Sequence, residues 1–341
     1  MNFIQIIGTQ RSGSNLLRAM LNQLPEITAP HPPHILKTFI PLLPEYGSLF
    51  EDTNFSHLVN DVCTWVELNP VSWQIAKIDR AMIQQRCESN TLVDLFYTIY
   101  SCYAEKLKST YTCCKSMGNV HQYQQLEAAG LKPYYIFLHR DGRDVACSFK
   151  KAIVGEKHAY HIAKQWKHDQ EKALEVRQNI PSARFIEVKY HDLITNPTLV
   201  LKNLCAFLDV TFSTIMLDYF HAEESLNTAR SGKMWENLSH PIIKDNYNKY
   251  LKELNSEELQ IFETIAGDIL AELGYSITSH FKNKKRISEF DIEVFDLLNI
   301  KMKQGIISSA NSHDIEVRCP QKYFLNTLKK RLNNKKIKEY A

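Results

Sequence analysis

Residues 3–18 read FIQIIGTQRSGSNLLR, and this stretch decides the fold that we expect for the 341-residue chain. The apolar run from Phe3 to Ile7 is typical of a buried strand. The next eight residues form a small polar loop, and apolar residues then recur at helical spacing, at Leu16, Leu17, Met20, Leu21 and Leu24. A strand, a short polar loop and a helix start make an anion cradle, because loop N–H groups and the positive end of the helix dipole point at one spot.

The loop resembles the phosphate-binding P-loop but departs from it at one position. Gly8 and Gly13 have the P-loop spacing, whereas Ser14 stands where that motif has lysine. Arg11 supplies a positive charge instead. Because the Lys-Ser/Thr pair that accompanies Mg²⁺ is missing, the loop predicts that a phosphate or sulfate group is handled without a metal. Taken alone, it is also compatible with an ordinary strand-to-helix turn.

Composition narrows the class of protein. Apolar residues make up 44% of the chain and charged residues 23%, which is ordinary for a globular protein. The net charge of +3 is too small to indicate nucleic-acid binding. The eight cysteines include no C-x-x-C pair, and no leader or long apolar run is evident. We therefore expect reduced thiols, a cytoplasmic location and no transmembrane segment.

The positive charge is concentrated near the end of the chain. From residue 280 onward there are 14 Lys and Arg against 7 Asp and Glu. We expect a solvated surface helix or tail, and contact with a membrane surface or a partner is the alternative.

Alternating strand and helix patterns continue after the first helix. Short apolar runs predict strands at 111–114, 134–138 and 184–188, and helical spacing predicts helices at 91–108, 119–129, 143–152, 157–178, from 196 and over 256–273. This order predicts an α/β fold: a P-loop-like parallel sheet flanked by helices on both faces. We expect one domain over 1–279, with 31–90 as a helical insertion over the acceptor site, and a basic C-terminal extension over 280–341.

A second strand-to-helix junction lies in residues 134–151, YYIFLHRDGRDVACSFKK. Arg140 follows the apolar strand, at the sheet edge where open α/β sheets bind ligands. Ser148 lies eight residues further on, about two helical turns into the next helix. The guanidinium can bind a phosphate bidentately while the hydroxyl donates to the same group. The alternative is that the charged residues of this motif only form salt bridges within the loop.

Together the two motifs resemble those of PAPS-dependent sulfotransferases, where PAPS is 3′-phosphoadenosine 5′-phosphosulfate. Arg11-Ser12-Gly13-Ser14 is similar to their 5′-phosphosulfate loop, and Arg140 to Ser148 to their 3′-phosphate motif. Arg18-Ala19-Met20-Leu21 and Arg140-Asp141-Gly142-Arg143 look most like the tyrosylprotein sulfotransferases and related bacterial enzymes. The resemblance covers roughly residues 3–275 and implies the sulfotransferase fold, with PAPS as donor and PAP as product.

The resemblance also implies roles for single residues. Lys115 is similar to the family lysine that contacts the transferring sulfonate, and Arg11 acts on the same group. The residues implied to bind the cofactor are Arg11, Ser12, Gly13, Ser14, Asn15, Arg140, Ser148, Tyr190, Arg230 and Gly232, of which Arg230 and Gly232 rest on a weak match. Trp166 is expected to be a core residue.

The catalytic base departs from the tyrosylprotein pattern. A glutamate about twenty residues after the loop arginine is absent, and the stretch reads Pro30-His31-Pro32-Pro33-His34. Histidine, with an ordinary pKa near ~6.5, is suited to accept a hydroxyl proton. Spacing favours His31, and His34 is the alternative.

The leading hypothesis is a sulfotransferase that moves a sulfuryl group from PAPS to a hydroxyl or amine of a small molecule by in-line displacement, without a metal. A nucleotide-dependent kinase and a non-catalytic nucleotide- or sulfate-binding protein are the alternatives. Residues 31–90 and the region near 225–245 are expected to form the acceptor pocket. Neither a nucleic-acid partner nor a transmembrane segment is expected, and a homodimer is left open.

Overall fold

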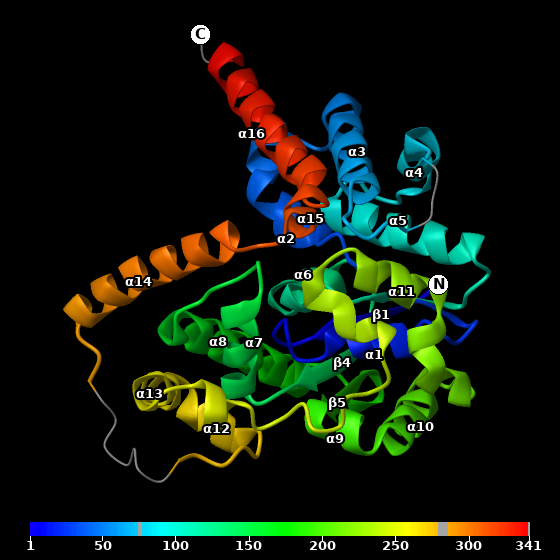
Figure 1. Ribbon diagram of the computed structural model, residues 1–341. Helices are drawn as coiled ribbons and strands as arrows, with labels where there is room; N and C mark the ends of the chain where they lie inside the picture. The colour runs from blue at the N-terminus through cyan, green and yellow to red at the C-terminus, as the bar shows by residue number, and fades with distance from the viewer. Residues whose placement is uncertain (74–76, 279–285, 340–341) are drawn as a thin grey trace.

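Five parallel strands form one sheet in the computed structural model, which describes residues 1–73, 77–278 and 286–339 (Figure 1). The strands are β1 (Asn2–Ile7), β2 (Ile27–Thr28), β3 (Tyr111–Cys114), β4 (Tyr134–His139) and β5 (Phe185–Lys189). They lie in the order β2-β3-β1-β4-β5, so the strand of the opening stretch is central. The predicted parallel α/β fold is confirmed.

Helices cover both faces of this sheet. Alternate residues of β4 point to opposite sides: Ile136 and Leu138 belong to one core cluster, and Tyr135 and Phe137 to another. The first face is covered by α1 (Ser14–Leu21), α9 (Tyr190–Thr195), α10 (Pro197–Phe207) and η4 (Thr214–His221). The second is covered by α7 (Gly142–Lys151), α8 (Ala159–Asn179) and α13 (Ser256–Glu272). Burial on both faces explains why the strands read as continuous apolar runs.

A third core cluster lies beyond the β3 side of the sheet, at the top of Figure 1. It is built by α2 (Ile35–Phe39), η1 (Ile40–Tyr46), α3 (Asp52–Glu67), α4 (Arg80–Arg86), α5 (Leu92–Lys106) and the last helix, α16 (Cys319–Glu339). Leu328 and Leu332 of α16 are buried in this cluster. The basic end of the chain is therefore partly a packed helix, anchored on the segment that we expected to be an insertion.

The remaining elements complete the periphery. They are η2 (Met117–Gln122), α6 (Tyr123–Ala128), η3 (Ser182–Arg184), α11 (Glu223–Arg230), η5 (Lys233–Ser239), α12 (Tyr250–Glu253), α14 (Glu289–Ser308) and α15 (Ser312–Glu316). The single helix expected over 119–129 is thus a 3-10 turn followed by a short α-helix. The turn is held on the central strand, because Asn119 Nδ2 donates to Gln5 Oε1 at 3.0 Å.

The C-terminal helices pack on the body of the protein. Asn299 Oδ1 on α14 accepts from the backbone N–H groups of Lys157 (2.8 Å) and His158 (3.1 Å), and Phe295 packs against Tyr160. The expected boundary between 279 and 280 lies outside the described residues.

Gly142 at the start of α7 has no space for a side chain. A Cβ there would lie 2.6 Å from ring atoms of both Phe262 and Trp166. Trp166 is fully buried, as expected for a core residue, and its Nε1 donates to the Arg140 carbonyl at 3.2 Å. The small residue at position 142 therefore allows α8 to support the backbone of the second motif.

We predict that Gly142→Ala lowers the free energy of unfolding by about 1–3 kcal/mol, the usual cost of overpacking a core. Urea denaturation followed by circular dichroism measures it. Gly118→Ala is the matched control, since a Cβ at Gly118 meets nothing within 4 Å. Equal stability of the two variants would contradict this account of the junction.

Candidate active site

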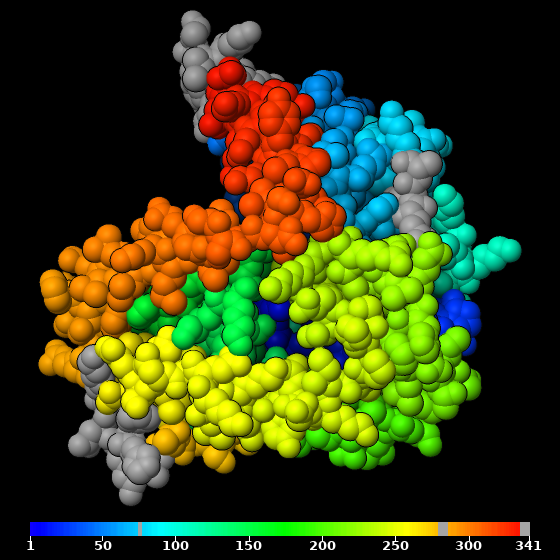
Figure 2. All heavy atoms as spheres, viewed as in Figure 1, coloured from blue at the N-terminus to red at the C-terminus, as the bar shows by residue number. Residues whose placement is uncertain are grey.

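The ligand-binding motifs line one large cavity of about 1750 Å³. Its floor is the loop after β1, and its walls come from residues 31–42 around α2, from α7 and the loop that follows it, from the η5 region and from the C-terminal helices. Figure 2 shows the hollow between the C-terminal helices and the yellow-green segment that contains η5, with the N-terminal part of the chain at its bottom.

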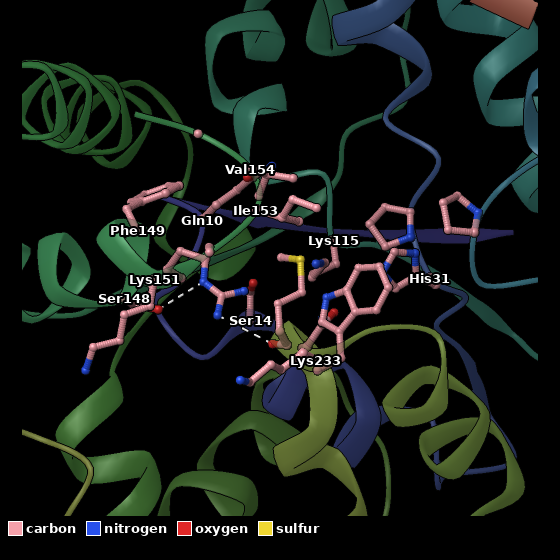
Figure 3. A pocket seen from close by; sticks show the side chains of 18 of the residues that line it. Gln10, Ser14, His31, Lys115, Ser148, Phe149, Lys151, Ile153, Val154 and Lys233 are labelled. Atoms are coloured by element: carbon pink, nitrogen blue, oxygen red, sulfur yellow. Dashed lines mark hydrogen bonds between the residues drawn. The ribbon is translucent and has the colours of Figure 1, made fainter. Parts of the chain in front are cut away.

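Arg11 joins the two predicted motifs directly. Its Nε donates to Ser148 Oγ at 3.0 Å, and its Nη2 donates to the Met234 carbonyl at 3.4 Å (Figure 3). Its own carbonyl accepts from Arg140 Nη1 at 3.4 Å. The backbone of Arg11 has φ 73°, a conformation that few residues other than glycine adopt. The structure therefore brings Arg11, Arg140 and Ser148 into one site.

Besides the Arg11 carbonyl, three groups hold Arg140 at the edge of the cavity. Its Nη2 donates to the Asn246 carbonyl at 2.9 Å, and its guanidinium lies 4.6 Å from the ring centroid of Tyr190. The Asp144 carboxylate is 3.7 Å away. Tyr190 in turn packs on the loop, because a Cβ at Gly13 would lie 2.3 Å from its ring and Gly13 also has φ 88°. Only glycine satisfies both constraints at position 13.

The alternative reading of the second motif, as salt bridges alone, holds for its other arginine. Arg143 is fully buried and pairs with Asp141 at 2.7 Å and Glu263 at 2.6 Å. Arg140 lines the cavity, and Arg143 is part of the core below it. The same motif thus supplies one arginine that lines the cavity, Arg140, and one that stabilises the core, Arg143.

Lys115 follows β3 immediately and lies on the cavity wall (Figure 3). It is buried, and burial lowers its pKa to about 7, with the positive charges of Arg18 and Arg11 acting in the same direction. Arg18 is itself fully buried, paired with Glu224 at 2.8 Å and donating to the Ala29 carbonyl at 2.8 Å. Arg18 therefore supports the chain just before His31.

His31 is buried beside Lys115 and packs edge-on against Trp235, with the ring centroids 4.8 Å apart. Burial lowers its pKa well below the usual value, and Lys115 and Arg18 lower it further. Its carbonyl is fixed by Trp73 Nε1 at 2.6 Å. The imidazole is therefore neutral at physiological pH.

The neighbouring amide of Asn69 holds the backbone of His31 and lies beside its ring. Asn69 Nδ2 donates to the carbonyls of Val71 (2.7 Å) and His31 (3.1 Å), and it lies 3.4 Å from His31 Nδ1. The two carbonyls take both hydrogens of this amide, so the contact with Nδ1 leaves the tautomer of neutral His31 open. Nε2 is buried and has no partner among the described residues, so it is free to accept or to donate a hydrogen bond, according to the tautomer.

His34 lies on the same cavity wall, half-buried, at the residue before α2. Burial lowers its pKa to about 3, and Lys115 and Lys37 contribute in the same direction. Within the described part of the chain, neither of its ring nitrogens has a hydrogen-bond partner. A neutral imidazole with a free nitrogen can accept a proton.

The remaining predicted residues divide into two groups. Gly13, Ser14, Asn15 and Tyr190 line the cavity, whereas Ser12 is buried behind the loop with no partner found for its hydroxyl in the part of the chain that is described. Arg230 and Gly232 do not line it: Arg230 is exposed at the end of α11, and Gly232 packs on Asp314.

Sequence reasoning missed the contribution of the C-terminal segment. Arg318 lies 5.0 Å from the ring centroid of Trp235, which also packs against the His31 ring. The Nη2 of Arg318 lies 3.2 Å from Met234 Sδ. No spacing links residues so far apart in the chain. The signal present was the excess of Lys and Arg from residue 280 onward.

Within residues 1–73, 77–278 and 286–339, no group of three or more His, Cys, Asp or Glu side chains is arranged to hold a metal ion. None of the helices in these ranges combines the length and apolarity needed to cross a bilayer.

Comparisons with known proteins agree with this architecture. The sequence model of the sulfotransferase family matches residues 4–214, so the chain belongs to that family. Curated proteins give no match. The fold is similar to the sulfotransferase domain of the Synechococcus PCC 7002 olefin synthase (TM-score 0.53, 23% identity, 78% of this chain and 94% of that one). It is also similar to a sulfotransferase domain from the curacin biosynthetic pathway (TM-score 0.54, 22% identity, 81% and 99%).

We predict that the Lys115 ammonium titrates near pH 7, so that it is charged below this pH and neutral above it. NMR of the reductively ¹³C-methylated protein measures this, and Lys115→Met identifies the resonance by its loss. Arg11→Gln should raise the measured pKa, because it removes one of the positive charges that lower it. A Lys115 resonance that titrates near pH 10 would contradict the prediction.

Proposed function

We propose that the protein is a PAPS-dependent sulfotransferase that sulfates a hydroxyl or amine of a small molecule. Membership of the sulfotransferase family supports sulfate transfer, and the contact between Arg11 and Ser148 carries the more specific proposal. It brings the loop that resembles a 5′-phosphosulfate site against the motif that resembles a 3′-phosphate site. Two anion-binding motifs on one cavity match a donor with a charged group at each end.

Unpartnered polar atoms support a ligand of this kind. The buried atoms without a partner among the described residues include Asn15 Oδ1, Arg140 Nε and His31 Nε2, all of residues that line the cavity. Buried polar groups are normally hydrogen-bonded, so these atoms need a ligand or water. Ten Lys and Arg but only five Asp and Glu line the cavity, which favours an anionic occupant.

The residues that line the cavity would have the following roles in sulfuryl transfer. PAPS would supply the sulfuryl group on a phosphate leaving group. Arg11, Lys115 and the loop N–H groups would stabilise negative charge that grows at the cradle. His34, with a free nitrogen, would accept the acceptor proton, and His31 would form a hydrogen bond in the cavity through its unpartnered Nε2. The greater exposure of His34 supports this division, whereas spacing alone favoured His31 as the base.

The proposal is tested by incubating the protein with PAPS and a panel of hydroxylated and amine metabolites and following products by mass spectrometry. The assay is run with and without EDTA, because we expect turnover without a divalent metal. Thermal shift with PAP against ADP plus Mg²⁺ separates a sulfotransferase from a kinase. Stabilisation by ADP and Mg²⁺ alone would refute the proposal.

We predict that Arg140→Ala weakens PAP binding at least about tenfold, because a hydrogen bond to a charged group is worth roughly 1.5–3 kcal/mol. Isothermal titration calorimetry measures the affinity. Arg177→Ala is the control, since Arg177 is exposed and pairs with Glu187 and Glu272 away from the cavity. Unchanged PAP affinity in a folded Arg140→Ala protein would remove Arg140 from the donor site.

We predict that His34→Ala lowers kcat by about 10²–10⁴, the usual scale for loss of a general base, and leaves PAP affinity near wild type. His31→Ala should lower kcat by up to about 10²–10³, the scale for loss of one donor to a developing charge. Single-turnover kinetics compares the two. If His31→Ala gives the larger loss, His31 is the base; near-normal kcat in both places the base elsewhere.

A further inference from the structure

The helix α16 presents one basic face to the cavity. Arg318, directly before the helix, and then Lys322, Leu325 and Lys329 all line it, at the spacing of one helical stripe. The stripe begins at Arg318, which contacts Trp235 next to His31. It ends eleven residues later at Lys329, about 16 Å along the helix axis. This stripe lies beyond the region, residues 4–214, that the family model matches.

The wall near the stripe is apolar at depth and basic further out. Trp65 and Leu42 line the cavity together with prolines 32, 33 and 41, and Gln321 Nε2 of α16 donates to the Trp65 carbonyl at 3.1 Å. Lys37, exposed on α2, adds a cation to the same cavity. The cavity therefore has an apolar lining beside the histidines, and Lys322 and Lys329 of α16 add positive charges further along the stripe.

The outer cations lack intramolecular partners. Arg318 is engaged by Asp314 at 3.4 Å and by Trp235. In contrast, the side chains of Lys37, Lys322 and Lys329 form no ion pair or hydrogen bond within the described residues. Most of the carboxylates on the cavity already have cationic partners, as in the pairs of Glu156 with Lys303, Glu253 with Lys151 and Asp144 with Arg140.

We propose that the acceptor is an elongated, largely apolar alcohol or amine with an anionic group at its far end, a carboxylate or a phosphate monoester, held by Lys322 and Lys329 of α16. The proposal rests on the function proposed above. The reacting group lies near His31 and His34, and the apolar part lies along Trp65 and Leu325. The anion lies about 6–16 Å from Arg318 along the helix axis. The stripe lines a concave cavity, which fits a bound molecule better than a flat membrane surface.

Binding of matched chains tests this without turnover. The probes are 10-hydroxydecanoate, 10-hydroxydecyl phosphate, neutral 1,10-decanediol and cationic 10-amino-1-decanol, and affinity is read by calorimetry in the presence of PAP. We expect the two anionic probes to bind at least about fivefold tighter than the diol, and the ammonium probe to bind most weakly. The ratio of the carboxylate to the phosphate identifies the preferred anion.

Charge reversal on α16 supplies the control. Lys322→Glu/Lys329→Glu should abolish the preference for the anionic probes, whereas Lys330→Glu should keep it, because Lys330 is exposed on the same helix and does not line the cavity. Equal binding of diol and carboxylate, or an equal effect of the Lys330 variant, overturns the inference. PAP affinity, measured in the same proteins, reports separately on the proposed function.

Discussion

The site depends on one interaction, the contact of the Arg11 guanidinium with Ser148 and the Met234 carbonyl. It ties the loop after β1 to α7 and to η5, three segments that are far apart in the sequence. The arrangement is unfavourable by itself, because Arg140 lies next to Arg11, and burial together with this charge lowers the pKa of Arg11 to about 10. Packing therefore has to hold together charges that repel each other, and an anion in the cradle would offset the repulsion.

Close packing supplies that support at two glycines. Gly13 lets the Tyr190 ring lie on the loop, and Gly142 lets Trp166 reach the Arg140 carbonyl. Each aromatic ring thus fixes the backbone next to one of the two arginines. The sheet and its covering helices hold the site in place, and the buried ion pairs of Arg143 with Asp141 and Glu263 add to this support.

Sequence patterns predicted the sheet and the donor motifs because both are local. Each strand is a short apolar run followed by polar residues, and its carboxyl end places Arg11, Lys115 and Arg140 on one sheet edge. The eight-residue spacing from Arg140 to Ser148 was sufficient to place both on the cavity. The local sequence could not predict that Arg143 is a buried core residue, because its partner Glu263 lies 120 residues away. The residue type alone does not distinguish an arginine that lines the cavity from one that is buried in the core.

The packing of the C-terminal segment was harder to predict, because its many lysines indicate a solvated helix although one face of the helix is apolar. The lysine run suggested a solvated helix, yet Leu328 and Leu332 are buried and Phe324 and Leu325 pack beside them. These four residues have helical spacing, so the sequence does contain the pattern of a packed helix. The high charge of the segment favoured the interpretation as a solvated helix instead. The contact of Arg318 with Trp235 had no such signal, since it joins a turn to a 3-10 helix across the cavity.

The same cations that make the cradle attractive to an anion also make the histidines weak bases. Lys115 lowers the pKa of both His31 and His34, and Arg18 acts on His31 as well. An anion bound at the loop would offset these charges, so it would raise the basicity of the histidines and keep Lys115 protonated. Proton acceptance would then become effective only after the donor is in place. The electrostatics of the cavity would therefore couple activation of the acceptor to occupancy of the donor site, without a moving part.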